Sequence, residues 1–295
     1  MLSGWTHPFA PLGIPLVDRD EPAAIIGAVL ADIEAGAQPK LMLLPYLATD
    51  GPFAAALTAA VAARGGRSAE FGRHVRALLA PGDARDDYLT RAMGAKKRKE
   101  LRRQRRRLAE SGTVAFESSD EFAKVIPTLH DFLDLEAKGW KGRAGTAAAQ
   151  QRVVRAFIEN AVTALAAEDK AIIIRLAHAG RAIAAGIVLR SGNGAWFWKI
   201  AYDEEMASAS PGTQLALELS EILLRERGVA FTDSCATAGH PMIDHLWRER
   251  VTIADWLIGL QGSGSSPFAL VRALEPLRRE AFSAAKRVRD LLRGG

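Results

Sequence analysis

The chain has 295 residues, of which 48% are hydrophobic and 25% are charged. At about 150 residues per domain, this length predicts two domains or one large one and excludes a small motif-sized module. The composition is typical of a soluble globular protein with a sizeable core, which excludes global disorder. Because Cys235 is the only cysteine, an internal disulfide and a thiolate-rich zinc site are also excluded, and we expect the protein to be cytoplasmic.

The positive charge is concentrated in one segment. The formal net charge is +5, but residues 96–107 (KKRKELRRQRRR) hold nine basic residues and one acidic residue, a local charge of +8 that leaves −3 elsewhere. A single basic segment is weaker evidence for nucleic-acid binding than a basic surface. The apolar runs are shorter than the about 20 residues of a membrane span, and the first residues lack the pattern of a secretory signal.

Short apolar runs alternate with helical patterns up to about residue 91, which predicts an α/β arrangement. The predicted elements are a strand at 13–17, a helix at 21–34, a strand at 40–45, and a helix at 52–64 that ends at Gly65 and Gly66. Turn-forming residues open the stretch 81–94 and predict a domain boundary there.

A strongly charged helix is predicted for residues 95–111, because this stretch lacks proline and glycine and stops at Gly112. Leu101 and Leu108, one heptad apart, form a narrow apolar stripe, so most of this helix should face solvent or an anionic partner. Two longer helices follow, at 121–140 with an interruption near Pro127, and at 147–167.

Three antiparallel strands come next, at 171–179, 181–192 and 195–203, joined by short connections typical of hairpins. The best-specified helix spans 211–227, with Ser210 at the N-cap and Pro211 at the first helical position. The chain should end with a strand at 229–234, a short helix around 243–250, a strand at 253–260, a flexible break at 261–267 and an amphipathic helix at 268–292.

Several segments carry a resemblance to a known family. They are FLDLEAKGWKGRAGTA (132–147), RAIAAGIVLRSGNGAWFWKIAYDEEMASASPGTQL (181–215) and TDSCATAGHPMIDHLWRER (232–250). The element order from 171 to 260 resembles the Gcn5-related N-acetyltransferase (GNAT) fold. The sequences of the segments most resemble the CelD/BioF2-like acetyltransferase domain, which is associated with cellulose and polysaccharide biosynthesis. The basic segment 98–117 resembles this family and also the related FemABX transferases of peptidoglycan synthesis.

The resemblance implies an α/β (α+β) fold with a mixed, mainly antiparallel sheet flanked by helices. It implies four segments: a partial GNAT-like α/β domain at 1–92, a basic linking helix at 93–112, a GNAT-like acyltransferase domain at 113–262 and an amphipathic helix at 263–295. Residues 5–20 (WTHPFAPLGIPLVDRD) look like a family segment before which members carry further sequence. We therefore expect the first GNAT-like half to be smaller and incomplete.

The start of the helix at 211–227 is the expected acyl-CoA site. The coenzyme A pyrophosphate is an anion, and a helix start offers free N–H groups and partial positive charge. Ser210, Pro211, Gly212 and Thr213 would supply these groups here, although the family signature has two glycine-type positions and SASPGTQL has one. Alternatively, Ser-Pro-Gly simply caps the helix.

The strand at 195–203 is expected to separate from its neighbour and to present Ile200 and Ala201 to the pantetheine arm, as the resemblance implies. A plain half-buried strand, with one set of side chains on each face, would explain the same residues without a ligand. The two sets would be Trp196, Trp198 and Ile200 against Phe197, Lys199 and Ala201.

Direct transfer needs a base to take a proton from the acceptor and an acid to protonate the departing thiolate. Tyr202 suits the acid role, and His240 or Asp203 suits the base role, with Glu204 as a further titratable candidate. Each also has a structural explanation, since Asp203 can cap a turn and His240 can end a strand before Pro241.

The acceptor pocket is expected at GWKG (139–142), where Trp140 would stack on a sugar or acyl chain and Lys141 would hold an anion. Gly142 is expected to belong to the same substrate-binding site. The cations could instead only complement a helix end. Asp233 ends a predicted strand, where α/β sheets often place ligand groups, and Asp244 and Trp247 are weaker candidates. Cys235 is assigned no role, and no zinc, P-loop or dinucleotide motif is present.

Three functions remain open. The first is an acyltransferase that moves an acetyl or longer acyl group from acyl-CoA to an amine or hydroxyl of a sugar, envelope precursor or small metabolite, without a metal. The second is a FemABX-like transferase that draws its donor from aminoacyl-tRNA, with the basic segment 96–107 on tRNA phosphates. The third is a non-catalytic protein that binds nucleic acid or another anionic surface.

Overall fold

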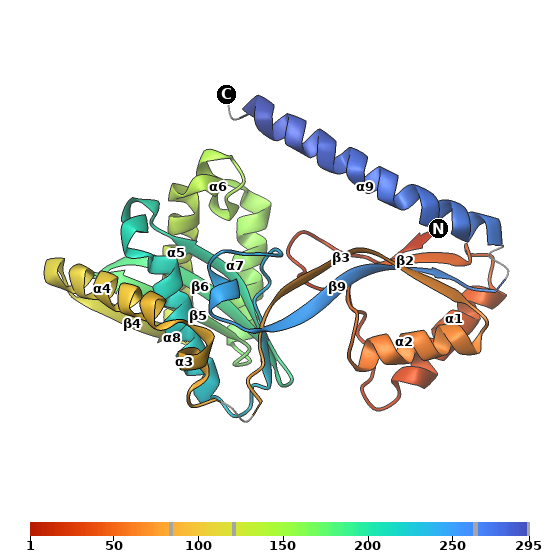
Figure 1. Ribbon diagram of the computed structural model, residues 1–295, viewed down its shortest axis with the longest axis horizontal. Helices are drawn as coiled ribbons and strands as arrows, with labels where there is room; N and C mark the ends of the chain where they lie inside the picture. The colour runs from red at the N-terminus through yellow and green to blue at the C-terminus, as the bar shows by residue number, and fades with distance from the viewer. Residues whose placement is uncertain (83–84, 120–121, 262–264, 294–295) are drawn as a thin grey trace. The chain divides into compact units, whose positions relative to one another are not determined.

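The computed structural model describes residues 1–82, 85–119, 122–261 and 265–293, and the chain forms two compact units (Figure 1). The first unit holds residues 1–75 and 251–295, and the second holds residues 76–250. Two strands, β3 (Arg67–Leu79) and β9 (Glu249–Gly259), contribute residues to both units. The expected segment 113–262 is therefore divided near residue 250, and the basic helix belongs to the second unit.

The first unit is a sheet with helices on both faces. Its strands lie in the order β1 (Leu2–Ser3), β2 (Leu41–Ala48), β9 and β3. The helices α1 (Pro22–Ala35) and α2 (Pro52–Ala63), which were both predicted, bury Leu30 and Leu57 against one face. On the other face, α9 (Ser265–Arg293) packs through Phe268.

Three features of the first unit differ from prediction. Residues 13–17 form no strand, because Pro15 has no N–H to donate; the Gly13 N–H bonds the β2 backbone at Tyr46 O. The strand β2 continues past Pro45 to Ala48 through a bulge at Tyr46 (φ 54°), whose N–H donates to Asp255 Oδ1 at 2.7 Å. The long strand β3 was not predicted at all.

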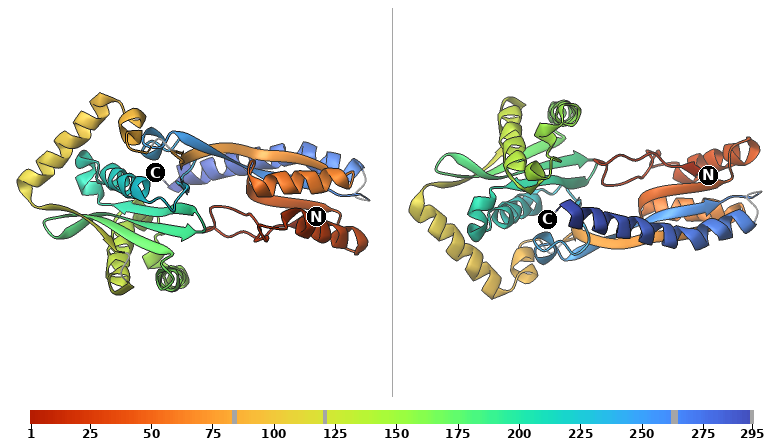
Figure 2. Two further views of the ribbon diagram at one scale, coloured as in Figure 1. Left: turned by 90° about the horizontal axis from the view of Figure 1, so that it is seen from below. Right: turned by 90° about the horizontal axis from the view of Figure 1, so that it is seen from above.

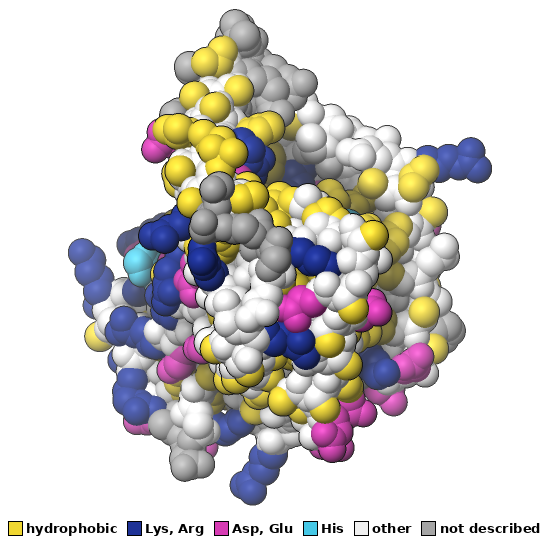
Figure 3. Space-filling model, turned by 90° about the vertical axis from the view of Figure 1, so that its right-hand side faces the viewer, with side chains coloured by type: hydrophobic (Ala, Val, Ile, Leu, Met, Phe, Trp, Pro, Cys, Tyr) yellow, Lys and Arg dark blue, Asp and Glu magenta, His cyan; other side chains and the backbone are white. Residues whose placement is uncertain are grey.

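The helix α9 leaves much of its apolar surface uncovered. Leu270, Leu274, Leu277, Phe282 and Val288 are each at least half exposed, and Figure 3 shows hydrophobic side chains gathered at the top of the view, along this helix. Residues 262–264 of the expected flexible break lie outside the described residues. None of the helices in the described ranges combines the length and apolarity that a membrane span requires.

The second unit contains the predicted run of hairpins. Its strands lie in the order β3, β8 (Phe231–Asp233), β7 (Gly194–Tyr202), β6 (Arg181–Ser191), β5 (Ala171–His178) and β4 (Val114–Ser119). The pairs β4–β5, β5–β6 and β6–β7 are antiparallel, and β7–β8 is parallel. The expected α/β (α+β) fold with a mainly antiparallel sheet is confirmed.

Helices cover both faces of this sheet (Figure 2). The short helix α3 (Tyr88–Ala92), the basic helix α4 (Ala95–Ser111) and α8 (Pro211–Arg225) share one core, which includes Leu101, Leu108 and Leu215. The helices α5 (Phe122–Lys138) and α7 (Arg152–Ala166) share the other core with Ile173 and Ile187. The successive β5 residues Ile172 and Ile173 enter opposite cores, as the two-residue period of a strand requires.

Some helix predictions need correction. The helix α5 runs without a break through Pro127, which removes only one backbone hydrogen bond near the start of the helix, and the predicted first residue, Glu121, lies outside the described residues. After α5 come the short helix α6 (Trp140–Arg143) and a single 3₁₀ turn, η1 (Ala148–Gln150). The predicted helix at 243–250 is one turn only, η3 (Ile243–His245), because β9 begins at Glu249.

Candidate functional site

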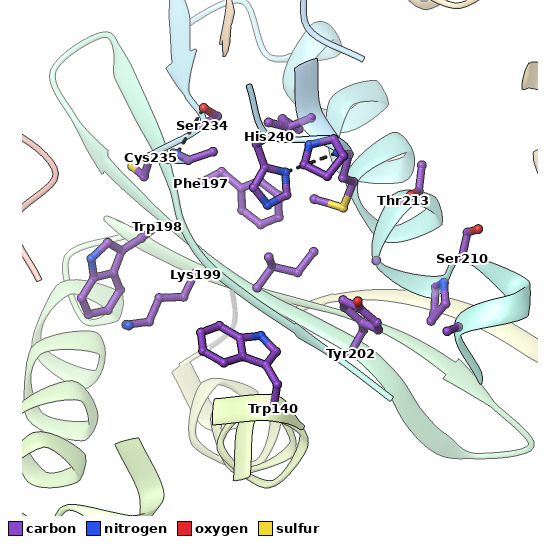
Figure 4. Close-up of a pocket in the computed structure, with 18 of the residues that line it drawn as sticks. Trp140, Phe197, Trp198, Lys199, Tyr202, Ser210, Thr213, Ser234, Cys235 and His240 are labelled. Atoms are coloured by element: carbon purple, nitrogen blue, oxygen red, sulfur yellow. Dashed lines mark hydrogen bonds between the residues drawn. The ribbon is translucent and has the colours of Figure 1, made fainter. Parts of the chain in front are cut away.

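A gap between two neighbouring strands opens a pocket in the second unit. The strands β7 and β8 pair over only three positions, Gly194 to Trp196 with Phe231 to Asp233. From Phe197 onward β7 continues without this partner, so its backbone and the α8 start face a cavity of about 530 Å³ (Figure 4). Residues that line it come from α6, β7, the start of α8 and the 234–243 stretch.

A bulge in β7 sets which side chains reach the pocket. Ile187 pairs with Lys199 and Val188 pairs with Phe197, so Trp198 is the extra residue. Phe197 and Ile200 pack against the α8 core, whereas Trp198 and Ala201 pack against the α5 core. The simple alternation predicted for this strand is therefore wrong after Trp198, since a bulge shifts the period by one residue.

The start of α8 forms one wall. Ser210 has a left-handed backbone (φ 52°) and no side-chain capping bond, so the predicted Ser210 side-chain cap is absent. The segment before the helix is instead held by Gln214, which is buried and donates from Nε2 to Ala209 O at 2.6 Å. Gly212 faces the pocket, where a Cβ would lie 3.2 Å from the Tyr202 ring and 3.5 Å from Met242 Sδ. Residues 210–213 all line the cavity, so this turn borders it.

The segment after β8 forms the opposite wall. Asp233 lies beneath this wall in an ion pair with Arg76 at 2.6 Å, and both side chains are nearly inaccessible. Its other oxygen accepts the Cys235 N–H at 2.9 Å, which helps hold Cys235 at a positive φ of 51°. Burial, and then the nearby carboxylate, raise the pKa of the Cys235 thiol, so it stays protonated near neutral pH and is no nucleophile.

The short helix α6 forms the third wall, and two carboxylates fix it. Glu136, buried on α5, binds Lys141 Nζ at 2.6 Å and accepts the Ala148 N–H at 2.8 Å. Glu204 accepts the Trp140 N–H at 2.7 Å and binds Arg143 at 2.5 Å, and the Arg143 hydrogen bond lowers the pKa of the Glu204 carboxyl. The Trp140 indole, 61% exposed, is therefore presented to the pocket on an anchored backbone.

Most of the predicted site residues meet in this pocket. Those that line it are Trp140, Lys141, Ile200, Tyr202, Ser210, Pro211, Gly212, Thr213 and His240. His240 Nδ1 lies 3.4 Å from the Met242 N–H, a long contact, and Tyr202 is 41% exposed. The structure thus brings together the expected donor, acid and base residues.

Four predicted residues do not line this pocket. Asp203 pairs with Arg181 and accepts the Glu205 N–H, as a turn cap does. Asp233 is held in its buried ion pair, and the Ala201 side chain packs into the α5 core. Gly142 turns α6 back on α5 so tightly that a Cβ would lie 1.7 Å from Ala137 O.

Sequence reasoning missed other lining residues, above all Lys199. Burial, and then the positive charge of Lys141, lower the pKa of the Lys199 ammonium, whose nitrogen lies 5.2 Å from the centre of the Trp198 indole. A lysine in the middle of the apolar strand AWFWKIAY was the available signal. Phe197, Ser234 and Met242 were also missed. Across the described ranges, no three His, Cys, Asp or Glu side chains gather as a metal site would need.

The architecture and the pocket can be compared with known proteins. Residues 95–237 match the family model of the acetyltransferase (GNAT) domain. A conserved protein of unknown function from Bacteroides thetaiotaomicron is similar at a TM-score of 0.55 and 12% identity, with 81% of this chain and 75% of that chain covered. FemX is similar at a TM-score of 0.55 and 11% identity, covering 92% and 85% of the two chains.

The C-terminal domain of a putative lysylphosphatidylglycerol synthetase from Agrobacterium fabrum has a TM-score of 0.52 and 17% identity, with coverage of 88% and 78%. At these identities the likeness shows the fold alone. No curated protein matches the chain.

Proposed function

Because residues 95–237 form a domain of the GNAT acetyltransferase superfamily, we propose that the protein is an acyltransferase that uses acyl-CoA as donor. The acyl group, acetyl or longer, would pass to an amine or hydroxyl of a sugar, envelope precursor or small metabolite. The observation that carries the proposal is the cavity between β7 and the uncapped start of α8.

The donor fits the α8 side of this cavity. The N–H groups of Gly212 and Thr213 belong to the first turn of a 15-residue helix, and no side chain caps them in the described structure. Such a turn binds the oxygens of a pyrophosphate through N–H groups and the partial charge of the helix. The unpaired part of β7, beside Ile200, offers backbone groups to the amide-bearing pantetheine arm.

Two side chains in the cavity suit the proton transfers. The acceptor nitrogen or oxygen attacks the thioester carbonyl carbon, the new C–N or C–O bond forms, and the C–S bond breaks. His240 would take the proton that the acceptor loses, giving up its long contact with the Met242 N–H. Tyr202 would give its proton to the departing sulfur and regain one from solvent, because its side chain is partly exposed.

One observation favours the FemABX-like alternative, in which aminoacyl-tRNA is the donor. The fold is similar to that of FemX, and α4 carries seven exposed cations, which could contact tRNA phosphates. They are Lys96, Lys97, Lys99, Arg102, Arg103, Arg106 and Arg107.

Titration of the purified protein with acetyl-CoA and longer acyl-CoA thioesters, followed by calorimetry and by the melting temperature, tests the donor. Stabilisation should grow with ligand concentration, by about 2.7 kcal/mol at one hundred times the Kd. No response to any acyl-CoA at millimolar concentration would refute this donor. Binding of charged tRNA with aminoacyl transfer would then support the second function, and tRNA binding without transfer would indicate a non-catalytic binding protein.

A further inference from the structure

We propose that the outward face of α9 is a membrane-binding surface, which lies on a bilayer that contains anionic lipids. The inference concerns the first unit, and it goes beyond the acyltransferase function proposed for the pocket of the second unit. It depends on which side of α9 packs against its sheet, on the apolar side chains that the other side leaves exposed, and on the charge of the helix.

One side of α9 is already used within its own unit. Phe268 and Val271 pack against the sheet beside Leu257 of β9. Further along the helix, Arg279 pairs with Asp255 of the same strand at 2.5 Å. At 3.6 residues per turn, Phe268, Val271 and Arg279 lie on one side of the helix. The opposite side therefore points away from this sheet.

The side that points away is apolar along about five turns of the helix. Leu270, Leu274, Leu277 and Val288 are each between 50% and 61% exposed (Figure 3). Small apolar side chains fill the positions between them and are exposed as well, namely Ala273, Ala281, Ala284 and Ala285. Because these positions recur within one to four residues on a single side, they form a continuous apolar stripe.

Phe282 makes this stripe wider. It is 66% exposed, and the guanidinium carbon of Arg278 lies 5.4 Å from the centre of its ring. With Phe282 included, the exposed apolar arc covers about half the circumference of the helix, whereas a coiled-coil partner needs only a narrow seam. The width of the face thus favours a bilayer surface over a single partner helix.

The charge of α9 complements an anionic surface. Its 29 residues include seven Lys or Arg and three Asp or Glu, a net charge of +4. Of the acids whose side chains are described, Glu275 is buried against Arg278 and Arg279, and Glu280 is exposed. A basic helix with one apolar face lies in the plane of the bilayer interface, where anionic lipids attract its cations. Apolar burial and charge therefore favour the same surface.

Vesicle binding by the full chain tests this inference. The protein is mixed with vesicles of phosphatidylcholine alone, or of phosphatidylcholine and phosphatidylglycerol at three to one, and the bound fraction is measured by flotation. The partition coefficient should be about ten-fold or more higher on the anionic vesicles, and it should fall as salt is added. Equal binding to the two kinds of vesicle, or binding to neither, would overturn the inference.

A matched pair of variants assigns the binding to the stripe. Leu274→Gln with Leu277→Gln removes two exposed leucines without changing the charge, and it should lower the partition coefficient about ten-fold or more. As a control, Leu16→Gln with Val153→Gln removes two apolar side chains that are 104% and 81% exposed outside α9, and binding should stay the same. Equal losses in the two variants would contradict the inference.

The basic helix α4 is the other surface that anionic lipids would attract, and a third variant tests it. Glutamine replaces four of its exposed cations, which are Arg102, Arg103, Arg106 and Arg107. Binding should persist in this variant, because the leucines of α4, Leu101 and Leu108, are buried and cannot enter a bilayer. Binding that is lost here and kept in Leu274→Gln with Leu277→Gln would assign the surface to α4 and overturn the inference.

Measurements without vesicles separate a membrane from a protein partner. The oligomeric state, from sedimentation equilibrium, should be the same in the unmodified protein and in Leu274→Gln with Leu277→Gln. The melting temperatures should agree within about 2 °C, because exposed side chains contribute little to stability. A dimer that the two substitutions dissociate would show that α9 binds a second copy, and a large fall in melting temperature would show that the chain itself covers the stripe. Either result would overturn the inference.

Discussion

The two sides of the pocket differ in what they offer to a ligand. On the α8 side the described groups are backbone N–H donors around Gly212 and Thr213, all within one turn of one helix. On the α6 side they are side chains from separate elements: Trp140 and Lys141 on α6, which Glu204 and Glu136 hold in place, and Lys199 on β7. A backbone turn suits a constant group such as a pyrophosphate, whereas a wall of side chains can change its specificity by substitution. The predictions below test that division.

The largest effect is expected at Gly212. Gly212→Asp adds a side chain against Tyr202 and Met242 and a negative charge where the pyrophosphate would bind. Affinity for acetyl-CoA, measured by calorimetry, should fall on the order of 1,000-fold, because the helix start can no longer accept an anion. As a control, Gly228→Asp adds the same side chain where a Cβ would meet nothing within 4 Å, and its affinity should equal that of the unmodified protein.

Tyr202→Phe should lower kcat for acetyl transfer about 100-fold and leave the acetyl-CoA Kd within about two-fold, since only the proton for the departing sulfur is lost. Steady-state rates and calorimetry on the same preparation give both values. A kcat close to that of the unmodified protein would remove Tyr202 from the acid role.

On the α6 side, Glu136→Gln should reduce the free energy of unfolding by about 2 kcal/mol, because a buried amide faces Lys141 where a carboxylate did. Denaturant unfolding measures this change, and the acetyl-CoA Kd should stay the same. The double variant with Lys141→Met should recover about 1 kcal/mol, since the unmatched ammonium is gone. A simple sum of the two losses would show that the pair is not coupled.

The alkylation rate of Cys235 tests whether this residue is a nucleophile in the pocket. Because the pKa of the folded thiol is raised, its thiolate fraction at pH 8 is small, and alkylation by iodoacetamide should be at least ten-fold slower than in the unfolded chain at the same pH. The rate should keep rising up to pH 10. A rate that levels off near neutral pH would reveal a reactive thiolate instead.

The smallest effect on the affinity for the acyl-CoA donor is expected from substitutions in the basic helix α4. Replacing Arg102, Arg103, Arg106 and Arg107 with glutamine should change the acetyl-CoA Kd by no more than about two-fold, because none of them lines the pocket. Any association with tRNA, measured by filter binding over a salt series, should weaken and depend less on salt. A large loss of acetyl-CoA affinity would extend the donor site to α4.

The sequence predicts the α8 side of the pocket better than the α6 side. The hairpins β5 to β7 and the helix α8 depend on residues near one another in the chain, and the sequence predicts them closely, although not the left-handed backbone of Ser210. The bulge at Trp198 cannot be read from the sequence, because nothing local distinguishes WFWKIAY from a regular strand. The bond from Glu204 to Trp140 joins residues 64 positions apart, and the burial of Lys199 depends on such contacts.

The tight turn at Gly142 also bears on how the protein could be redesigned. Any side chain there would collide with Ala137 O, so a library that randomises this position would yield mostly misfolded proteins. Trp140 projects freely from the same helix and can be replaced without disturbing its anchor, which is a backbone N–H. Directed evolution toward new acceptors should therefore diversify Trp140 while keeping the glycine two residues later unchanged.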